Sequence, residues 1–275
     1  MAALATIAPF GFDFDTPRLL AAYAALGCRS CQFYRNEAAP PDPATVARLA
    51  SAAGLRIDSI HGVFGYDYDP SSPDPRERAR CLEVYAAEAR LCRHLGGSMV
   101  VVHPSAWTPQ RRVLAPAEAE QVQGARWEDL DDFLRRLADV AAHAEVIFLL
   151  ENQPRNCYLG HDAPRLAQHV LRIGAPGIRM CLDVGHAHIT GDAAEIIRQC
   201  APAIQYFHVH DNDGLEDSHL MPGEGTMRWD VVGQTMREAA PHAVRMLEVF
   251  YPEPRVEAIL ARGEFRARLP WMLGL

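Results

Sequence analysis

Short apolar runs alternate with longer amphipathic segments along most of the chain. Apolar runs of this length between turn residues are typical of buried strands, and the longer segments have the spacing of helices. The predicted strands are residues 4–8, 29–34, 56–61, 98–103, 146–151, 178–183, 204–208 and 243–249. The predicted helices are residues 16–26, 43–53, 75–95, 127–142, 163–172, 193–200, 229–239 and 254–261. We place residues 108–124 in a long loop after the fourth strand.

Each predicted strand is followed by a helix, which is the pattern of repeated strand–helix units in a parallel sheet. The length of 275 residues suits a (β/α)₈ barrel, so we predict a single-domain TIM barrel over residues 1–275. A doubly wound open sheet is the rival fold, but no G-x-G-x-x-G turn follows the first strand. We expect the first helix to have Thr16 as its N-cap and Pro17 at its first position.

Composition removes several classes of function. All 27 basic residues are arginine, so a Schiff-base mechanism, which needs a side-chain amine, is excluded. The net charge of −8 gives no general attraction to nucleic acid. The chain has no apolar run long enough for a membrane span and no basic signal-peptide region at its start, so we expect a cytoplasmic protein. The seven scattered cysteines, including the C-x-x-C pair Cys28 and Cys31, are expected to be buried and free.

Polar residues stand at the carboxyl ends of six consecutive predicted strands, the end at which barrel enzymes carry their active sites. They are His61, His103, Glu151, Asp183 followed by His186, His208 and Glu248. Several buried carboxylates and imidazoles at one depth would lack partners, at a cost of roughly 1–3 kcal/mol each. A divalent cation supplies a shared partner, and this mixture of ligands suits zinc or manganese. We therefore predict a metal centre.

Further polar residues follow the sixth and seventh strands. Asp217 and His219 are two apart in a loop, so both side chains can face the same way and bind a further ion. A solvated acidic loop is the alternative for this pair. His210 is a candidate substrate-binding residue, with His188 and Asn152 near it. The remaining histidines are expected on the surface; they are His94, His143, His161, His169 and His242.

The motifs LLEN, CLDVGHAHITGD, FHVHDND and MPGEG occur in this order on successive strand ends. With them the chain resembles the xylose isomerase-like TIM barrel superfamily, which includes sugar isomerases and epimerases, inosose dehydratases and AP endonuclease family 2, related to endonuclease IV. The resemblance covers nearly the whole chain. These motifs identify the superfamily but do not choose between its reactions.

Two branches of the superfamily imply two sets of metal ligands. The epimerase branch implies a single metal held by Glu151, Asp183, His208 and Glu248, with both glutamates as acid and base and His186 on a substrate oxygen. The endonuclease IV branch implies three zinc ions and nine ligands. Its ligand types stand at His61, His103, Glu151, Asp183, His186, His208, Asp217, His219 and Glu248. Two departures are the lack of any lysine and the lack of an arginine in the stretch DNDGLED.

We therefore expect an enzyme with one to three Zn²⁺ or Mn²⁺ ions, most simply a metal-dependent isomerase or epimerase of a sugar, polyol or related hydroxy-carbonyl compound. The metal would stabilise an enediolate, while Glu151 and Glu248 exchange the proton and His186 orients an oxygen. Substrate contacts are expected from His61, His103, Trp107 and His210, with Phe64 and Tyr66 beside them. The alternatives are a multi-zinc phosphodiesterase or apurinic endonuclease and an inosose-type dehydratase. A small-molecule substrate is favoured over nucleic acid, and homo-oligomerisation is common in the superfamily.

Overall fold

Eight parallel strands form one closed barrel in the computed structural model, which describes residues 3–275. Each strand pairs with the next, and β8 pairs with β1 to close the ring. The strands are β1 (Leu4–Phe10), β2 (Ser30–Arg35), β3 (Arg56–His61), β4 (Met99–Val102), β5 (Ile147–Glu151), β6 (Ile178–Asp183), β7 (Ile204–Val209) and β8 (Val244–Leu247). The prediction of a (β/α)₈ barrel is confirmed.

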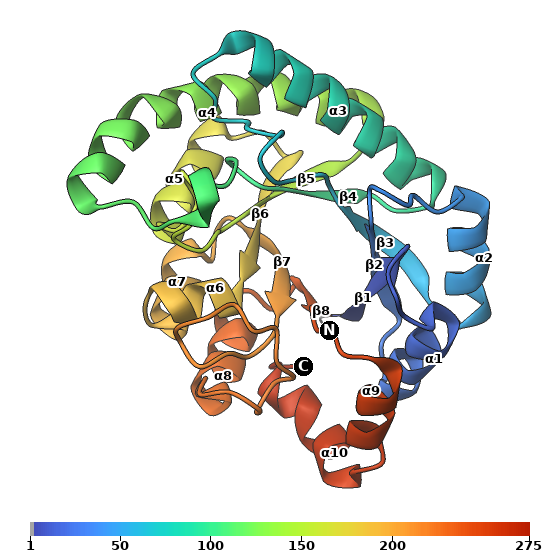
Figure 1. The fold of residues 1–275 in the computed structure, drawn as a ribbon. Helices are drawn as coiled ribbons and strands as arrows, with labels where there is room; N and C mark the ends of the chain where they lie inside the picture. Colours follow the sequence, from blue (N-terminus) through green and yellow to red (C-terminus); the bar gives the residue numbers. More distant parts are fainter. Residues whose placement is uncertain (1–2) are drawn as a thin grey trace.

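Helices surround the barrel on its outside (Figure 1). They are α1 (Thr16–Leu26), α2 (Pro43–Ala52), α3 (Pro75–His94), α4 (Pro116–Ala144), α5 (Ala163–Ile173), α6 (Val184–Thr190), α7 (Ala193–Cys200), α8 (Trp229–Ala239), α9 (Glu253–Leu260) and α10 (Gly263–Met272), with a short 3₁₀ turn η1 (Pro109–Arg111). None of the helices in residues 3–275 combines the length and the apolar character that a membrane crossing requires.

Three local predictions are wrong. The N-cap of α1 is Asp15, whose carboxylate accepts a hydrogen bond from the Arg18 N–H, and the Thr16 hydroxyl instead donates to the Pro9 carbonyl. The predicted loop 108–124 ends early because α4 begins at Pro116. Alanine, glutamate and glutamine dominate its first turns, and these residues favour helix, while proline is tolerated in a first turn. Helices α6 and α10 are additional to the predicted ones.

Two apolar layers hold the barrel together. The larger layer lies between the strands and the helices. The smaller one fills the inside of the barrel with Ala5, Ile7, Met99, Val101, Leu149, Cys181, Tyr206 and Met246. As in other barrels of this size the interior is packed rather than open, so a cavity can form only beyond the strand ends. All seven cysteines are buried and free, as expected.

A buried arginine joins β8 to the helices at the end of the chain. Arg245 is fully buried and donates to the carbonyl oxygens of Met236 and Ala240 at the end of α8 and of Leu273 after α10. The Met236 and Ala240 carbonyls also accept the backbone N–H groups of Ala240 and Ala243, so the guanidinium adds a further donor at this end of α8. Burial lowers the pKa of Arg245 to about 10, which leaves it charged at neutral pH.

Candidate metal centre

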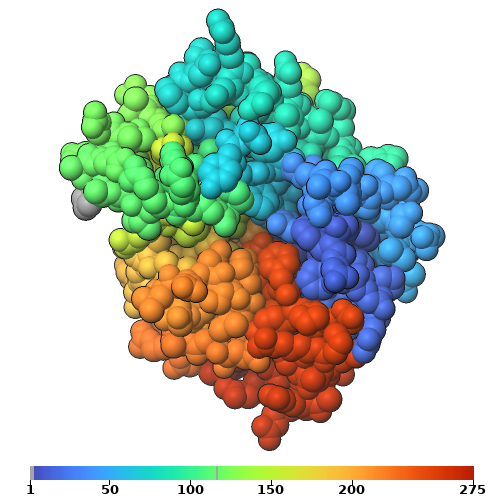
Figure 2. All heavy atoms as spheres, viewed as in Figure 1, coloured from blue at the N-terminus to red at the C-terminus, as the bar shows by residue number. Residues whose placement is uncertain are grey.

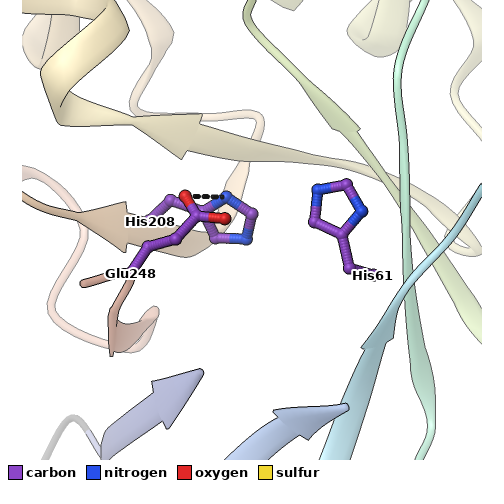
Figure 3. Close-up of side chains that lie close together, drawn as sticks. All are labelled: His61, His208 and Glu248. Carbon is purple, nitrogen blue, oxygen red and sulfur yellow. Dashed lines mark ion pairs between the residues drawn. The ribbon is translucent and has the colours of Figure 1, made fainter. Parts of the chain in front are cut away.

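Side chains from six strand ends meet at the carboxyl end of the barrel. His61, Glu151 and Asp183 are the last residues of β3, β5 and β6, and His208 lies near the end of β7. His103 and Glu248 come directly after β4 and β8. Figure 3 shows His61, His208 and Glu248 directed toward a common centre across the barrel. We call the set His61, His103, Glu151, Asp183, His186, His208 and Glu248 the rim cluster.

The donor atoms of the rim cluster fall into overlapping groups of the size that one ion needs. Atoms of Glu151, Asp183, His208 and Glu248 all lie within 4.8 Å of one another, and the same holds for His61, His103 and Glu151. A third group contains Asp183, His186 and His210. Beside it, one oxygen of Asp217, Oδ2, lies 3.1 Å from His186 Nε2 and 3.3 Å from His219 Nε2. The four acids and the histidines of the predicted ligand set are therefore brought together.

Two of the close imidazole–carboxylate approaches in the centre are not hydrogen bonds. His103 Nε2 lies 3.0 Å from Glu151 Oε2, and His208 Nδ1 lies 3.0 Å from Glu248 Oε2. Neither carboxylate oxygen has a hydrogen-bond partner, because the atoms are close but not aligned. Two ligands held tetrahedrally at about 2.0–2.1 Å from one zinc ion lie roughly 3.3 Å apart. The spacing and the unpartnered oxygens both fit a shared cation.

Three histidines have the same orientation relative to the backbone. Nδ1 of His61, His186 and His219 lies 2.9, 2.8 and 2.9 Å from the carbonyl oxygens of Gly62, Asn152 and Glu248. A carbonyl only accepts hydrogen bonds, so Nδ1 carries the proton, and in the neutral ring Nε2 presents a lone pair. In all three rings Nε2 faces a carboxylate. A lone pair against a carboxylate is repulsive unless a proton or a metal ion lies between them, and metal-binding histidines are oriented in this way.

The histidines and carboxylates of the centre shift each other's pKa values. Burial lowers the pKa of His208, but Cys181, Glu248 and Glu151 together raise it well above its usual range. Burial raises the pKa of Glu248, yet the neighbouring His208 and His219 reduce it to about 2. Burial also lowers the pKa of His219, but the neighbouring Asp217 outweighs this and raises the pKa to about 9. The carboxylates of the centre therefore favour positive charge beside them, and a divalent cation would supply such charge.

A glycine makes room for a buried histidine beside these ligands. A Cβ atom on Gly185 would lie 1.9 Å from the His210 ring. His210 Nε2 lies 3.1 Å from both carboxylate oxygens of Asp183, and the ring stacks on His219 at 4.0 Å. His210 is fully buried and is not among the described residues that line the cavity. The structure therefore does not bring His210 to the cavity surface, because Gly185 leaves room for the ring to lie against Asp183.

Above the centre lies a cavity of about 880 Å³. Its floor includes His61, His103, Glu151, His186 and Glu248. Its walls include Tyr34, Phe64, Trp107, Arg111, Arg155, Asp217, His219 and Phe250. Figure 2 shows this face of the molecule hollowed near its centre, where green, orange and blue segments approach one another. The volume suits a small molecule.

Most predicted site residues lie on this cavity, but their depth differs. His61, His103 and Trp107, predicted to contact substrate, line it, whereas Asp183 and His208 are fully buried below its surface. Tyr66 packs edge to face against Trp107 and is not among the described residues that line the cavity. Tyr34 and Phe250 line the cavity as well and were not among the predicted site residues. Their only sequence signal is a position at or shortly after the end of a strand.

Comparison with known proteins places the fold and its centre in a family. The model of the xylose isomerase-like TIM barrel family matches residues 20–269, so the chain belongs to this family. An uncharacterized protein, MJ1311, of Methanocaldococcus jannaschii is 28% identical over 69% of this chain and 63% of its own length. Probable endonuclease 4 of Mycoplasma pneumoniae is 24% identical over 69% of this chain and 66% of its own length. The chain thus spans less than two thirds of either relative.

Solved structures with the same fold include sugar epimerases. The structure of an L-ribulose 3-epimerase has a TM-score of 0.78 and 22% sequence identity, and the match covers 100% of this chain and 95% of that one. An identity this low establishes the shared fold alone. Family membership therefore agrees with the resemblance seen in the motifs, and the reaction has to be argued from the site.

Proposed function

We propose that the protein is a divalent-metal-dependent isomerase or epimerase of a small sugar, polyol or related hydroxy-carbonyl substrate. Two carboxylates carry the proposal. Oxygens of Glu151 and Glu248 lie 2.9 and 3.0 Å from the same atom, Nδ1 of His208, and both residues line the cavity. Moving a proton from one face of a carbon to the other requires two such groups around one substrate. The likeness to an L-ribulose 3-epimerase supports this choice.

The residues present fit a divalent ion. Glu151, Asp183, His208 and Glu248 would hold it, since their donor atoms lie within 4.8 Å of one another and two of the carboxylate oxygens lack a hydrogen-bond partner. When bound, such an ion would polarise substrate oxygens and stabilise negative charge that develops on them. Zn²⁺ and Mn²⁺ both suit a ligand set of carboxylates and imidazoles.

The side chains around this group divide the remaining work. Either Glu151 or Glu248 removes the proton from the carbon next to the carbonyl, and the other returns a proton from the opposite side. The low pKa of Glu248, about 2, keeps its carboxylate ionised at neutral pH. His186, with Nδ1 held by the Asn152 carbonyl and Nε2 3.1 Å from Asp217, lines the cavity and orients a substrate oxygen. Phe64 and Trp107 reduce the access of water from one side.

The test is proton exchange at carbon in D₂O, with the variants Glu151→Gln and Glu248→Gln. Each should lower turnover of a ketose panel by about 10²–10⁴-fold, the usual contribution of a positioned acid or base. Glu238→Gln is the matched control, because Glu238 is an exposed residue of α8 that bonds only to Gln234. If both site variants kept full turnover and deuterium incorporation with metal bound, the proposed roles would be wrong.

A second candidate, a phosphoester hydrolase, is favoured by one further observation. The contacts of Asp217 with His186 and His219 add a donor group that a single-metal epimerase does not need. Together with His61, His103 and Glu151, the chain offers donors for more than one ion. Multinuclear centres suit displacement at phosphorus, and probable endonuclease 4 is among the relatives. Cleavage of an abasic-site duplex or a small phosphodiester by the zinc-loaded protein would favour this candidate over the first.

A further inference from the structure

Two arginines lie at the mouth of the cavity without an acidic partner. Arg111 belongs to η1, and Arg155 lies in the loop after β5. Both line the cavity and both are exposed. Within residues 3–275 neither makes an ion pair with a carboxylate, whereas the adjacent Arg112 pairs with Glu118 away from the cavity. Their charges are therefore available to a bound molecule.

Arg111 is held in place by an aromatic ring and by its backbone. Its guanidinium carbon lies 3.7 Å from the centre of the Trp107 ring, which in turn packs against Phe64 and Tyr66. Stacking on an aromatic face leaves the N–H groups at the edge of the guanidinium free to donate. Gln110 and Arg111 both have left-handed backbone angles, φ 53° and 54°, which side chains other than glycine rarely adopt. Such backbone angles tend to occur at binding sites.

The loops that carry the two arginines are joined to each other. Trp107 and Cys157 form an isolated antiparallel bridge, and the N–H of Thr108 donates to the Asn156 carbonyl at 2.9 Å. The Thr108 hydroxyl lies 3.0 Å from the same carbonyl. Arg155 is next to Asn156, and its guanidinium reaches the Thr190 carbonyl at 3.4 Å. Arg111 and Arg155 thus stand on one paired support rather than on two independent loops.

Another part of the cavity wall carries the opposite sign of charge. Glu216 and Asp217, from the segment between β7 and α8, line it there, and the floor carries Glu151 and Glu248. An anionic group of a ligand would be repelled from that wall and attracted to Arg111 and Arg155. Guanidinium groups bind phosphate and carboxylate through paired hydrogen bonds, which neutral sugar hydroxyls do not require.

We propose that Arg111 and Arg155 form a subsite for an anionic group, phosphate or carboxylate, at the end of the substrate remote from the rim cluster. The proposal rests on the proposed function of the rim cluster and narrows its substrate to an acidic one. A small molecule is favoured over a nucleic acid backbone as the source of the anion. The cavity of about 880 Å³ holds a monosaccharide derivative, and the net charge of −8 opposes binding of a polyanion.

The first test measures binding without any need for catalysis. Inorganic phosphate is titrated calorimetrically into the metal-loaded protein and into Arg111→Gln, Arg155→Gln and the control Arg112→Gln. A charge-assisted hydrogen bond corresponds to roughly a ten- to hundredfold change in affinity. We expect each site variant to lose that much and the control to bind as the parent does. Equal phosphate affinity in all four proteins would overturn the subsite.

The second test compares substrates of the same skeleton. A ketohexose, its 6-phosphate and a ketohexuronate are offered to the same four proteins. The acidic compound with the higher kcat/KM shows whether the subsite prefers phosphate or carboxylate. We expect kcat/KM to favour an acidic compound in the parent and in Arg112→Gln, and the preference to disappear in the other two variants. Arginine-independent turnover of the neutral ketohexose alone would overturn the subsite and leave the isomerase function standing. Phosphate binding that depends on Arg111 and Arg155, without turnover of any of the three compounds, would support the subsite and contradict the isomerase function.

A third arm separates the sources of phosphate. Binding of an abasic-site DNA duplex is measured at increasing salt concentration with the same variants. We expect no binding that depends on Arg111 or Arg155. Tight duplex binding that both variants weaken would overturn the assignment to a small acidic substrate.

Discussion

Two polar clusters of the barrel differ in how their atoms are satisfied. Toward the amino ends of the strands, Ser30, Asp58, Ser59 and Tyr206 form what we call the lower cluster. The hydroxyls of Ser30 and Ser59 donate to the two carboxylate oxygens of Asp58 at 2.5 and 2.7 Å, and Tyr206 also donates to Asp58. The rim cluster instead leaves Glu151 Oε2, Glu248 Oε2, His103 Nδ1 and His208 Nε2 without hydrogen-bond partners.

The difference shows what a structural polar cluster and a functional one require. In the lower cluster each acceptor has its own donor, so no additional component is needed. In the rim cluster carboxylates and imidazoles face each other at ligand spacing, and only protons or a cation can relieve their repulsion. A buried group left unpaired costs roughly 1–3 kcal/mol, so the rim cluster is retained at a cost in stability that function must explain. Four predictions test this contrast.

Gly185→Ala should have the largest effect, because it disturbs His210 directly beside the rim cluster. The added methyl group would lie 1.9 Å from the His210 ring and displace it from Asp183. We expect a loss of about 3 kcal/mol in the free energy of unfolding, at the upper end for overpacking, together with weaker metal binding. Urea denaturation and metal titration measure the two effects. Gly191→Ala is the control, because its Cβ would come no closer than 3.4 Å to any atom. Equal behaviour of both variants would contradict the prediction.

Metal loading should stabilise the protein by a similar amount. An ion that binds only the folded state adds about 2.7 kcal/mol when its free concentration is a hundred times its dissociation constant. We expect the melting temperature to rise by several degrees on addition of Zn²⁺ or Mn²⁺ and to fall again with chelator. Scanning calorimetry measures the shift. An unchanged melting temperature would mean that the rim cluster is satisfied without a cation.

Tyr206→Phe tests the lower cluster with a smaller expected effect. The variant loses the hydroxyl that lies 3.1 Å from Ser59 Oγ and 3.2 Å from Asp58. One hydrogen bond of this kind contributes about 1 kcal/mol. We expect that loss in the free energy of unfolding by urea denaturation, and the same number of bound metal ions as in the parent. A change in metal content would show that the two clusters are not independent.

Asp58→Asn should give the smallest effect, visible as a change in pH dependence. Burial raises the pKa of Asp58, and hydrogen bonds from Ser30 and Ser59 only partly oppose this. An acid whose pKa is higher in the folded state loses stabilisation as pH rises from its unfolded pKa, about 3.9, through its folded pKa. The free energy of unfolding of the parent should therefore fall relative to that of Asp58→Asn over this range. Parallel curves would show that Asp58 does not titrate differently on folding.

The features that depend on neighbouring residues along the chain could be predicted from the sequence. Apolar runs ending in His61, Glu151 or Asp183 reveal both a strand and its functional end, because in a parallel barrel all these ends share one rim. The absence of lysine and the two-residue spacing of Asp217 and His219 can likewise be seen in the sequence. These properties need no knowledge of which loops touch.

Features that depend on tertiary contacts were missed. His169 was predicted on the surface, but it is buried between α4 and α5, where it lies 2.6 Å from Asp131 and stacks on Trp127. His210 was assigned to substrate because nothing in its neighbours reveals that Gly185 opens a space beneath the cavity. The support of Arg111 depends on the bridge between Trp107 and Cys157, fifty residues apart. Contacts of this range leave no pattern in the local sequence.

The most direct test is the metal content of the protein, purified without chelator or a histidine tag and measured by elemental analysis before and after reconstitution. We expect at least one divalent ion per chain, and less in Glu151→Gln, whose missing carboxylate contributes to two of the donor groups. One ion would agree with the isomerase, whereas two or three zinc ions would favour the hydrolase. A parent protein that holds no ion even after reconstitution would contradict a metal centre at the rim cluster.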